Sequence, residues 1–237
     1  MALKAINMIS NNISELGLKI NSACQRSGRR PDEVKIVAVT KTATVEQILK
    51  ALAAGIDNIG ENRVQDAAYK FNEIRNTQYA SRIKWHMVGH LQTNKVKEAV
   101  RIFDLIHSVD SEKIGVEIDK QAAKINKVQD ILVEVNISQE PTKFGLKPEE
   151  AVEVIAEIAQ LKSICIKGLM TIAPFVDNPR DVRSFFSQLR KLRGKLNELR
   201  VTDYELRELS MGMTDDFEVA IEEGSTIVRI GRAIFKG

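Results

Sequence analysis

Short apolar runs alternate with amphipathic stretches of helical period along the whole chain. Eight of the runs have the length and β-branched composition of strands, and at least one helix-like segment separates each from the next. We predict strands at residues 35–40, 57–60, 84–88, 105–108, 131–137, 164–171, 208–211 and 226–230. Several of them are apolar almost throughout, which is typical of parallel strands covered on both faces.

Capping residues, glycines and prolines between these strands indicate where helices begin and end. Thr44 and Gln47 have the spacing of a capping box, and Gly55 follows the apolar positions of the same helix. Pro148 and Asn178, which precedes another proline, mark two further helix starts. Before the first strand, apolar residues recur at helical spacing and predict an amphipathic helix. They are Leu3, Ile6, Ile9, Ile13, Leu16 and Ile20.

The number and order of these elements define the expected fold class. Eight strand–helix units without a low-complexity linker predict one α/β domain over residues 1–237, a (β/α)8 barrel of the TIM type. An extra N-terminal helix, within residues 1–30, is expected to pack on the barrel. A chain of 237 residues is a common size for this fold. A doubly wound open sheet has the same periodicity and remains the alternative.

Composition and charge narrow the class of protein. The net charge of +3 is too small to indicate a nucleic acid as partner, and no apolar run is long enough to span a membrane. Cys24 and Cys165 match no metal-ligand spacing and form no disulfide framework. The basic cluster at 183–195 is interpreted as a solvated helix face. We therefore expect a soluble, cytoplasmic protein that binds no metal, nucleic acid or membrane.

Lys41 follows the first predicted strand, at the end of the barrel where this fold places its functional groups. An amine shielded from water at such a position favours its neutral form, which attacks aldehydes. The alternative is a lysine whose amine only reaches solvent at the barrel rim.

The loops after the seventh and eighth strands carry small and hydroxyl-bearing residues. The run from Ser210 to Thr214 contains Gly212, and Gly231 precedes Arg232. In this fold these two loops commonly form a phosphate site, in which backbone N–H groups and hydroxyls surround the anion. Each loop alone is also explained as a turn that needs a glycine, but the two together favour a phosphate site.

Arg229 interrupts the apolar eighth strand. A guanidinium that points into the barrel requires a hydrogen-bond acceptor. The ring nitrogen of a bound heteroaromatic ligand meets this requirement, and so does a buried carboxylate.

Six blocks of sequence occur in a fixed order: 38–41 (AVTK), 60–63 (GENR), 85–95 (WHMVGHLQTNK), 168–170 (GLM), 210–213 (SMGM) and 228–232 (VRIGR). Together they resemble the signature of the pyridoxal phosphate homeostasis proteins of the YggS type. The resemblance extends from about residue 34 to residue 235. It implies a barrel like the N-terminal domain of bacterial alanine racemase, with bound pyridoxal 5′-phosphate (PLP).

The resemblance also implies roles for individual residues. Lys41 is expected to carry PLP as a Schiff base, the internal aldimine, and Arg229 to face the pyridine nitrogen. The phosphate is expected near Ser210, Thr214, Gly231 and Arg232, and Met211 and Gly212 of the same loop are also expected to bind the cofactor. Further pocket positions are expected at Asn62, His86, Asn136 and Met170. Serine is commoner in the family at the position of Thr214, but the hydroxyl is kept.

Two classes of function fit such a barrel, a PLP enzyme such as an amino-acid racemase and a carrier that buffers PLP. Racemisation needs a second acid–base group, which alanine racemases take from a tyrosine of an additional C-terminal domain. This chain ends soon after the eighth strand, and Tyr69, Tyr79 and Tyr204 lie away from the predicted strand ends. We therefore expect a carrier in PLP homeostasis with little or no catalysis. A Schiff-base aldolase that uses Lys41 on a sugar phosphate is a third interpretation.

The remaining expectations concern partners and two conspicuous side chains. Apo forms of PLP enzymes are the expected recipients of the cofactor, and the protein is expected to be a monomer, with a dimer as the alternative. His107 is interpreted as a hydrogen-bonded structural residue at a strand end. Trp85 is expected to pack between the barrel and a helix, because strand alternation directs it away from His86.

Overall fold

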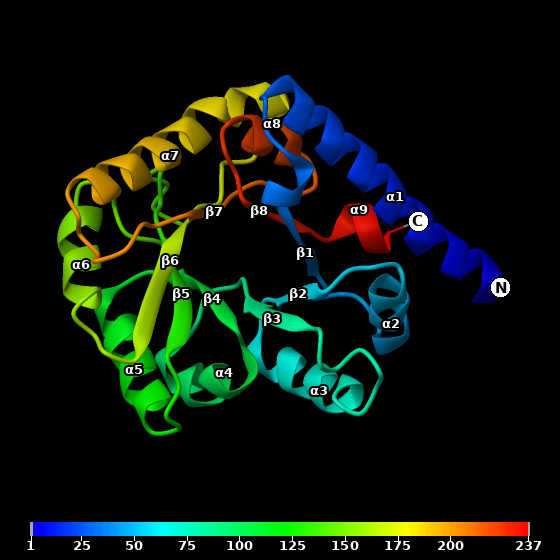
Figure 1. Ribbon diagram of the computed structural model, residues 1–237, viewed down its shortest axis with the longest axis horizontal. Helices are drawn as coiled ribbons and strands as arrows, with labels where there is room; N and C mark the ends of the chain where they lie inside the picture. Colours follow the sequence, from blue (N-terminus) through cyan, green and yellow to red (C-terminus); the bar gives the residue numbers. More distant parts are fainter. Residues whose placement is uncertain (1, 237) are drawn as a thin grey trace.

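Eight parallel strands pair in the order of the chain, and the last pairs with the first to close a barrel (Figure 1). The computed structural model describes residues 2–236, and side chains from residue 8 to residue 236. The strands are β1 (Lys35–Val39), β2 (Asn58–Glu61), β3 (Lys84–Met87), β4 (Leu105–Val109), β5 (Gln129–Glu134), β6 (Ile164–Met170), β7 (Glu208–Ser210) and β8 (Ile227–Ile230). The predicted barrel is confirmed, and the open sheet is excluded.

Helices surround the barrel on its outer side (Figure 1). They are α1 (Ala2–Arg26), α2 (Val45–Ala53), α3 (Val64–Ile74), α4 (Val96–Ile102), α5 (Glu112–Ala123), α6 (Ala151–Ile158), α7 (Arg183–Glu198), α8 (Phe217–Glu222) and α9 (Arg232–Phe235). Three short 3-10 turns, η1 (Pro31–Glu33), η2 (Thr93–Lys95) and η3 (Pro179–Val182), complete the described elements. No helix in residues 2–236 is long and apolar enough to cross a membrane.

Local sequence signals account for several helix starts. The capping box at the start of α2 is confirmed, because Thr44 and Gln47 exchange side-chain and backbone hydrogen bonds. Asn178 caps η3 by accepting a hydrogen bond from the N–H of Arg180. Pro148 precedes α6 by three residues, since that helix begins at Ala151.

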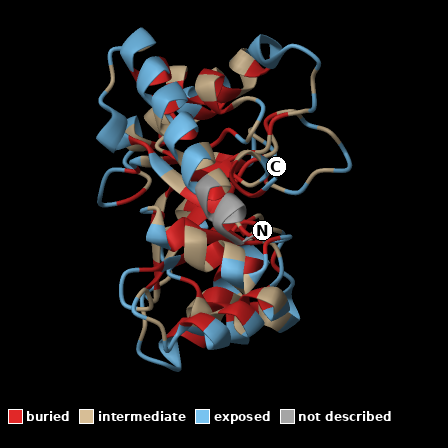
Figure 2. Ribbon diagram, turned by 90° about the vertical axis from the view of Figure 1, so that its right-hand side faces the viewer, coloured by how far each residue is buried: buried red, intermediate tan, exposed pale blue. Residues whose placement is uncertain are grey.

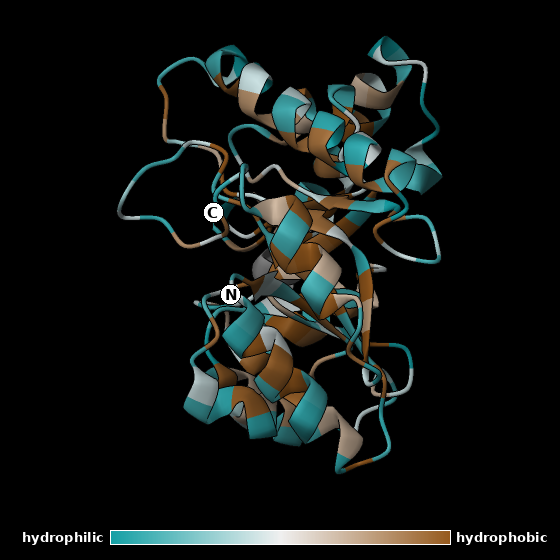
Figure 3. Cartoon of the chain, turned by 90° about the vertical axis from the view of Figure 1, so that its left-hand side faces the viewer, coloured by the Kyte–Doolittle hydropathy of each residue, from teal (hydrophilic) through white to brown (hydrophobic). Residues whose placement is uncertain are grey.

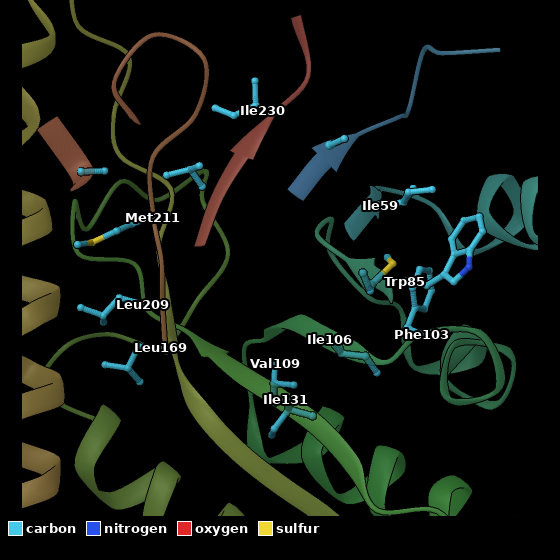
Figure 4. Close-up of a cluster of buried hydrophobic side chains, with 14 of the residues drawn as sticks. Ile59, Trp85, Phe103, Ile106, Val109, Ile131, Leu169, Leu209, Met211 and Ile230 are labelled. Carbon is cyan, nitrogen blue, oxygen red and sulfur yellow. The ribbon is translucent and has the colours of Figure 1, made fainter. Parts of the chain in front are cut away.

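The apolar core has two layers, one on each side of the sheet. The inner layer fills the barrel with Val37, Val88, Leu105, Leu132, Met170 and Ile227. The larger outer layer lies between strands and helices, and Figure 4 shows Leu169 and Leu209 pointing toward the flanking helices. Trp85 belongs to this outer layer and meets Phe71 of α3 edge to face, with ring centroids 5.7 Å apart, as predicted. Figure 3 shows the same division, with apolar strands inside and polar outer faces on the helices.

Helix α1 packs across α2, α8 and α9. Its buried face contains Ile9, Leu16 and Ile20, and its outer face is exposed (Figure 2). The side chains of Leu3 and Ile6 lie outside the described residues. Arg26 at the end of the helix forms ion pairs with Glu218 and Glu222 of α8. The basic cluster of α7 is only partly a solvated face, because its first arginine, Arg183, also pairs with Glu222.

Candidate functional site

A cavity of about 350 Å³ opens at the carboxyl end of the barrel. Its lining comes from the carboxyl ends of β1 and β8 and from the loops after β1, β2, β3, β6, β7 and β8. The lining residues are Val39, Lys41, Asn62, Val88, Ile172, Met213, Thr214, Asp215, Arg229, Gly231 and Arg232. Six of the twelve predicted site residues are therefore brought together in one cavity. A larger and more polar groove of about 650 Å³ lies beside it and shares Asn62.

Lys41 stands in the turn that follows β1 and is exposed to the cavity. The N–H of Ala43 donates to the carbonyl of Thr40 at 2.9 Å and closes this turn. Among the described residues, no hydrogen-bond acceptor or carboxylate contacts the Lys41 amine. The amine is therefore available to a ligand.

Arg229 of β8 forms the floor of the cavity. Its Nη1 donates to the carbonyl and the hydroxyl of Ser210, at 2.8 and 2.7 Å, and Nη2 donates to the carbonyl of Thr171 at 2.9 Å. These bonds use three of the five guanidinium N–H groups, and the other two have no partner among the described residues. Burial lowers the pKa of Arg229 to about 10, with Glu134 and Asp216 opposing the change. The guanidinium therefore stays charged at neutral pH.

The phosphate side of the predicted site is formed by the loops after β7 and β8. Thr214 lines the cavity, and its hydroxyl has no hydrogen-bond partner among the side chains and backbone groups that the structure describes. Gly212 adopts a positive φ of 94°, and a Cβ there would lie 2.6 Å from the Cβ of Ala220. The glycine thus lets this loop pack closely on α8. Arg232 forms an ion pair with Asp215 across the two loops.

A buried hydrogen-bonded chain runs through the barrel interior below Arg229. Nε2 of His86 lies 3.0 Å from Oδ1 of Asn58, and its Nδ1 lies 2.9 Å from Nε2 of His107. Nδ1 of His107 lies 2.9 Å from the hydroxyl of Ser210. The amide nitrogen of Asn58 donates to Asp57, so the Asn58 oxygen accepts from His86 and fixes both histidines as Nε2–H tautomers.

These hydrogen bonds bear on the predictions for His107 and for Ser210. Burial lowers the pKa of His86 to about 4 and also lowers the pKa of His107 well below its usual value, so both rings are neutral at ordinary pH. His107 is confirmed as a hydrogen-bonded structural residue. The hydroxyl hydrogen of Ser210 is directed at His107 and its oxygen accepts from Arg229, so Ser210 supports Arg229 from within the barrel.

The other predicted residues lie outside the cavity lining. Met170 is buried inside the barrel, and Met211 is buried between the barrel and the helices. Asn136 donates to the carbonyls of Glu140 and Lys143 and shapes the loop after β5. Five lining residues were not predicted, namely Val39, Val88, Ile172, Met213 and Asp215. Each lies in or within two residues of one of the six sequence blocks, and this proximity is the signal in the sequence that could have identified them.

The geometry defines a class of protein, a (β/α)8 barrel with a free lysine amine, an arginine floor and a hydroxyl-bearing loop around one cavity. The family model for the alanine racemase N-terminal domain matches residues 19–237. A pyridoxal phosphate homeostasis protein of Aquifex aeolicus is 44% identical over 217 residues, which are 92% of each chain. The chain belongs to the family of pyridoxal phosphate homeostasis proteins, and the resemblance of the six blocks is confirmed.

Solved structures agree with this membership. A protein of Bifidobacterium adolescentis of unknown identity is similar with a TM-score of 0.92 and 36% identity, over 98% of this chain and 96% of that chain. PipY of Synechococcus elongatus, solved with PLP bound, has a TM-score of 0.83 and 32% identity, over 96% of this chain and 99% of PipY.

Proposed function

We propose that this protein is a PLP carrier that holds the cofactor in the cavity, bonded to Lys41, and serves PLP homeostasis with little or no catalysis. The observation that carries the proposal is the donor set of the cavity. Lys41, Thr214 and Arg229 all line the cavity, and the Lys41 amine, the Thr214 hydroxyl and two N–H groups of Arg229 have no partners among the described residues. PLP offers an aldehyde, a phosphate and a ring nitrogen, which are matching partners for these three groups. The PLP bound to PipY supports the assignment.

Each predicted residue of the lining has a proposed part. Lys41 would bond the aldehyde carbon, Arg229 would donate a hydrogen bond to the ring nitrogen, and Asn62 would border the ring. Thr214 would hold the phosphate together with the backbone N–H groups of Gly231 and Arg232. The predicted residues outside the lining act from behind it, as Ser210 does on Arg229.

When bound, PLP supplies an aldehyde that amines attack and a ring that withdraws electrons. Arg229 would limit the electron withdrawal by the ring, because a guanidinium that remains charged would donate to the ring nitrogen and leave it unprotonated. A carboxylate at this position would instead hold a proton on the nitrogen. The residue therefore favours holding PLP over activating it.

The cavity also lacks an evident second acid–base group. Racemisation requires proton transfer on both faces of the substrate carbon. Besides Lys41, the titratable side chains among the described lining residues are Asp215, Arg229 and Arg232, and Asp215 is ion-paired with Arg232. The hydroxyl of Tyr204 is engaged elsewhere, since it accepts from the N–H of Ile166. These features support a carrier in preference to a racemase.

The cellular setting follows from the same proposal. Cys24 and Cys165 are both free thiols, which fits a reducing cytoplasm. Apo forms of PLP enzymes are the proposed recipients, and we propose that the carrier is a monomer.

The proposal is tested with protein that has been loaded with PLP. Incubation with L-alanine, followed by chiral chromatography, should show turnover far below the roughly 1–10³ s⁻¹ of ordinary enzymes. The same loaded protein should restore activity to an apo PLP enzyme. Racemisation or transamination at enzymatic rates would overturn the carrier, and so would failure to reactivate any apo-enzyme that free PLP reactivates.

A further inference from the structure

The turn that carries Lys41 depends on the residue before it, Thr40. The N–H of Thr40 donates to the carbonyl of Gly60 at 2.9 Å, and the carbonyl of Thr40 accepts from the N–H of Ala43 at 2.9 Å. Lys41 and Thr42 are the two central residues of this turn. The placement of Thr40 therefore sets the direction in which Lys41 leaves β1.

Two oppositely charged side chains hold Thr40 in place. Nζ of Lys70 on α3 lies 2.7 Å from the carbonyl oxygen of Thr40 and 2.7 Å from Oε1 of Glu61. The hydroxyl of Thr40 donates to the same oxygen of Glu61. Thr40 and Glu61 are 0% exposed and Lys70 is 7% exposed. We call Thr40, Glu61 and Lys70 the Thr40 clamp.

Stability alone does not explain a charged pair at this position. Removing two charges from water costs about as much free energy as their attraction returns, so an apolar pair of similar volume stabilises a fold equally well. Here the compensation is incomplete, because Oε2 of Glu61 is buried without a hydrogen-bond partner among the described residues. The distinctive contacts of the pair are those to Thr40.

We propose that Glu61 and Lys70 are positioning residues for Lys41. They fix Thr40 at its carbonyl and its hydroxyl, and the turn then presents Nζ of Lys41 at the place where the aldehyde of PLP arrives. In the bond-forming step the lone pair of Nζ adds to the aldehyde carbon. The aldehyde oxygen leaves as water with two protons from the amine, and a carbon–nitrogen double bond remains.

This inference rests on the proposed function, and it separates covalent capture of PLP by Lys41 from non-covalent binding of the cofactor. No residue of the clamp belongs to the cavity lining, and no clamp side chain forms a hydrogen bond with Arg229 or Thr214, which would bind the ring and the phosphate. Loss of the clamp should therefore slow covalent capture by Lys41 and leave non-covalent binding intact. A merely structural role would weaken both together.

Two variants and one control test the clamp. Glu61→Leu/Lys70→Met replaces the charged pair by an apolar one, and Thr40→Val removes only the hydroxyl. The control is Lys127→Met. Like Lys70, Lys127 binds backbone carbonyls, those of Val100 and Phe103 at 2.8 and 2.7 Å. These carbonyls precede β4 and lie at the end of the barrel opposite to Lys41. Capture of PLP is followed by the absorption band near roughly 420 nm and by the fraction trapped with borohydride. Non-covalent binding is measured with pyridoxine 5′-phosphate, which carries an alcohol in place of the aldehyde.

We expect both clamp variants to capture PLP more slowly, by a factor on the order of 10–100 for the double variant, while binding pyridoxine 5′-phosphate like the wild type. Lys127→Met should match the wild type in both measurements. Equal losses in both measurements, or no loss in either, would overturn the clamp. If the double variant does not fold, Thr40→Val decides alone. A wild-type protein without the band would remove the proposed function and the clamp with it, whereas a normal band in every variant removes only the clamp.

Discussion

Ser210 and Thr214 are four residues apart, the first at the end of β7 and the second in the loop after it, and both carry hydroxyls, yet the structure gives them different surroundings. Ser210 is buried with both of its hydrogen bonds made inside the barrel. Thr214 lines the cavity with its hydroxyl free of partners among residues 2–236. The sequence predicts both as phosphate contacts, because it shows the hydroxyls but not their directions. The direction of Ser210 depends on His107, which is 103 residues away in the chain.

Substituting Thr214 should therefore affect PLP binding, whereas substituting Ser210 should affect the stability of the fold. Thr214→Val is expected to weaken PLP binding by about 10–100-fold, since a hydrogen bond to a charged group contributes about 1.5–3 kcal/mol, with little change in the free energy of unfolding. Ser210→Ala should lower the free energy of unfolding by about 1–3 kcal/mol, because it leaves His107 and one Arg229 N–H unpaired. Ligand titration and urea denaturation measure the two effects. A destabilised Thr214→Val beside an unaffected Ser210→Ala would contradict these placements.

Glu134, at the end of β5, should give the stability of the protein a pH dependence. Burial raises the pKa of Glu134 to about 7 from 4.5, although Arg229 opposes the change. The folded state therefore holds this proton more tightly than the unfolded state. The free energy of unfolding consequently gains from Glu134 below pH 4.5 and loses that gain as the pH rises to about 7.

Glu134→Gln has no such proton to lose. At pH 8 the variant should exceed the wild type in free energy of unfolding by about 1–3 kcal/mol, and at pH 5 the difference should be much smaller. Urea denaturation at the two pH values measures this difference. Both proteins contain His86 and His107, so the comparison isolates Glu134. Parallel curves between pH 5 and pH 8 would argue against a raised pKa.

At the scale of single elements, β6 depends on a close approach that its sequence pattern does not reveal. A Cβ on Gly168 would lie 1.9 Å from the carbonyl oxygen of Glu208 on β7. Gly168→Ala must therefore separate the two strands or distort them. By contrast, a Cβ on Gly194 in α7 meets no atom within 4 Å.

The two glycines form a matched pair for a stability measurement. Gly168→Ala should lower the free energy of unfolding by more than about 2 kcal/mol. Gly194→Ala should raise it by about 0.5–1 kcal/mol, because alanine loses less conformational freedom in a helix than glycine. Thermal or urea denaturation of both variants provides the test. An unaffected Gly168→Ala would mean that β6 and β7 are less closely packed than described.

The strands and several helix starts were predictable because their signals are local. All eight strands occur, with ends within three residues of the predicted ones, and Thr44 caps α2 as its sequence indicates. The largest difference is at β5, which was predicted to reach residue 137 and ends at Glu134. Val135 and Ile137 are buried although they lie beyond the strand, and Val135 bridges to Leu146. These residues are apolar because they pack the loop against the core. In the sequence they continue the apolar run of the strand, so the predicted strand was too long.

At the scale of the whole molecule, the periodicity of the sequence could not distinguish a closed barrel from an open sheet. Closure requires β8 to pair with β1, where Lys35 lies opposite Ile227, and no local pattern encodes a contact across 192 positions. The cavity has the same origin, because Lys41, Ile172 and Arg229 meet only when the barrel is closed. Every lining residue lies in or within two residues of one of the six sequence blocks, while the division of the predicted residues into lining and support required the fold.

The most direct test concerns the amine that holds the cofactor. The absorption spectrum of purified protein mixed with PLP should be recorded for the wild type and for Lys41→Ala, before and after borohydride. We expect a band near roughly 420 nm in the wild type that disappears on reduction, and no such band in the variant. Equal spectra for the two proteins would place the cofactor on another group, and a wild type without the band would contradict covalent PLP binding altogether.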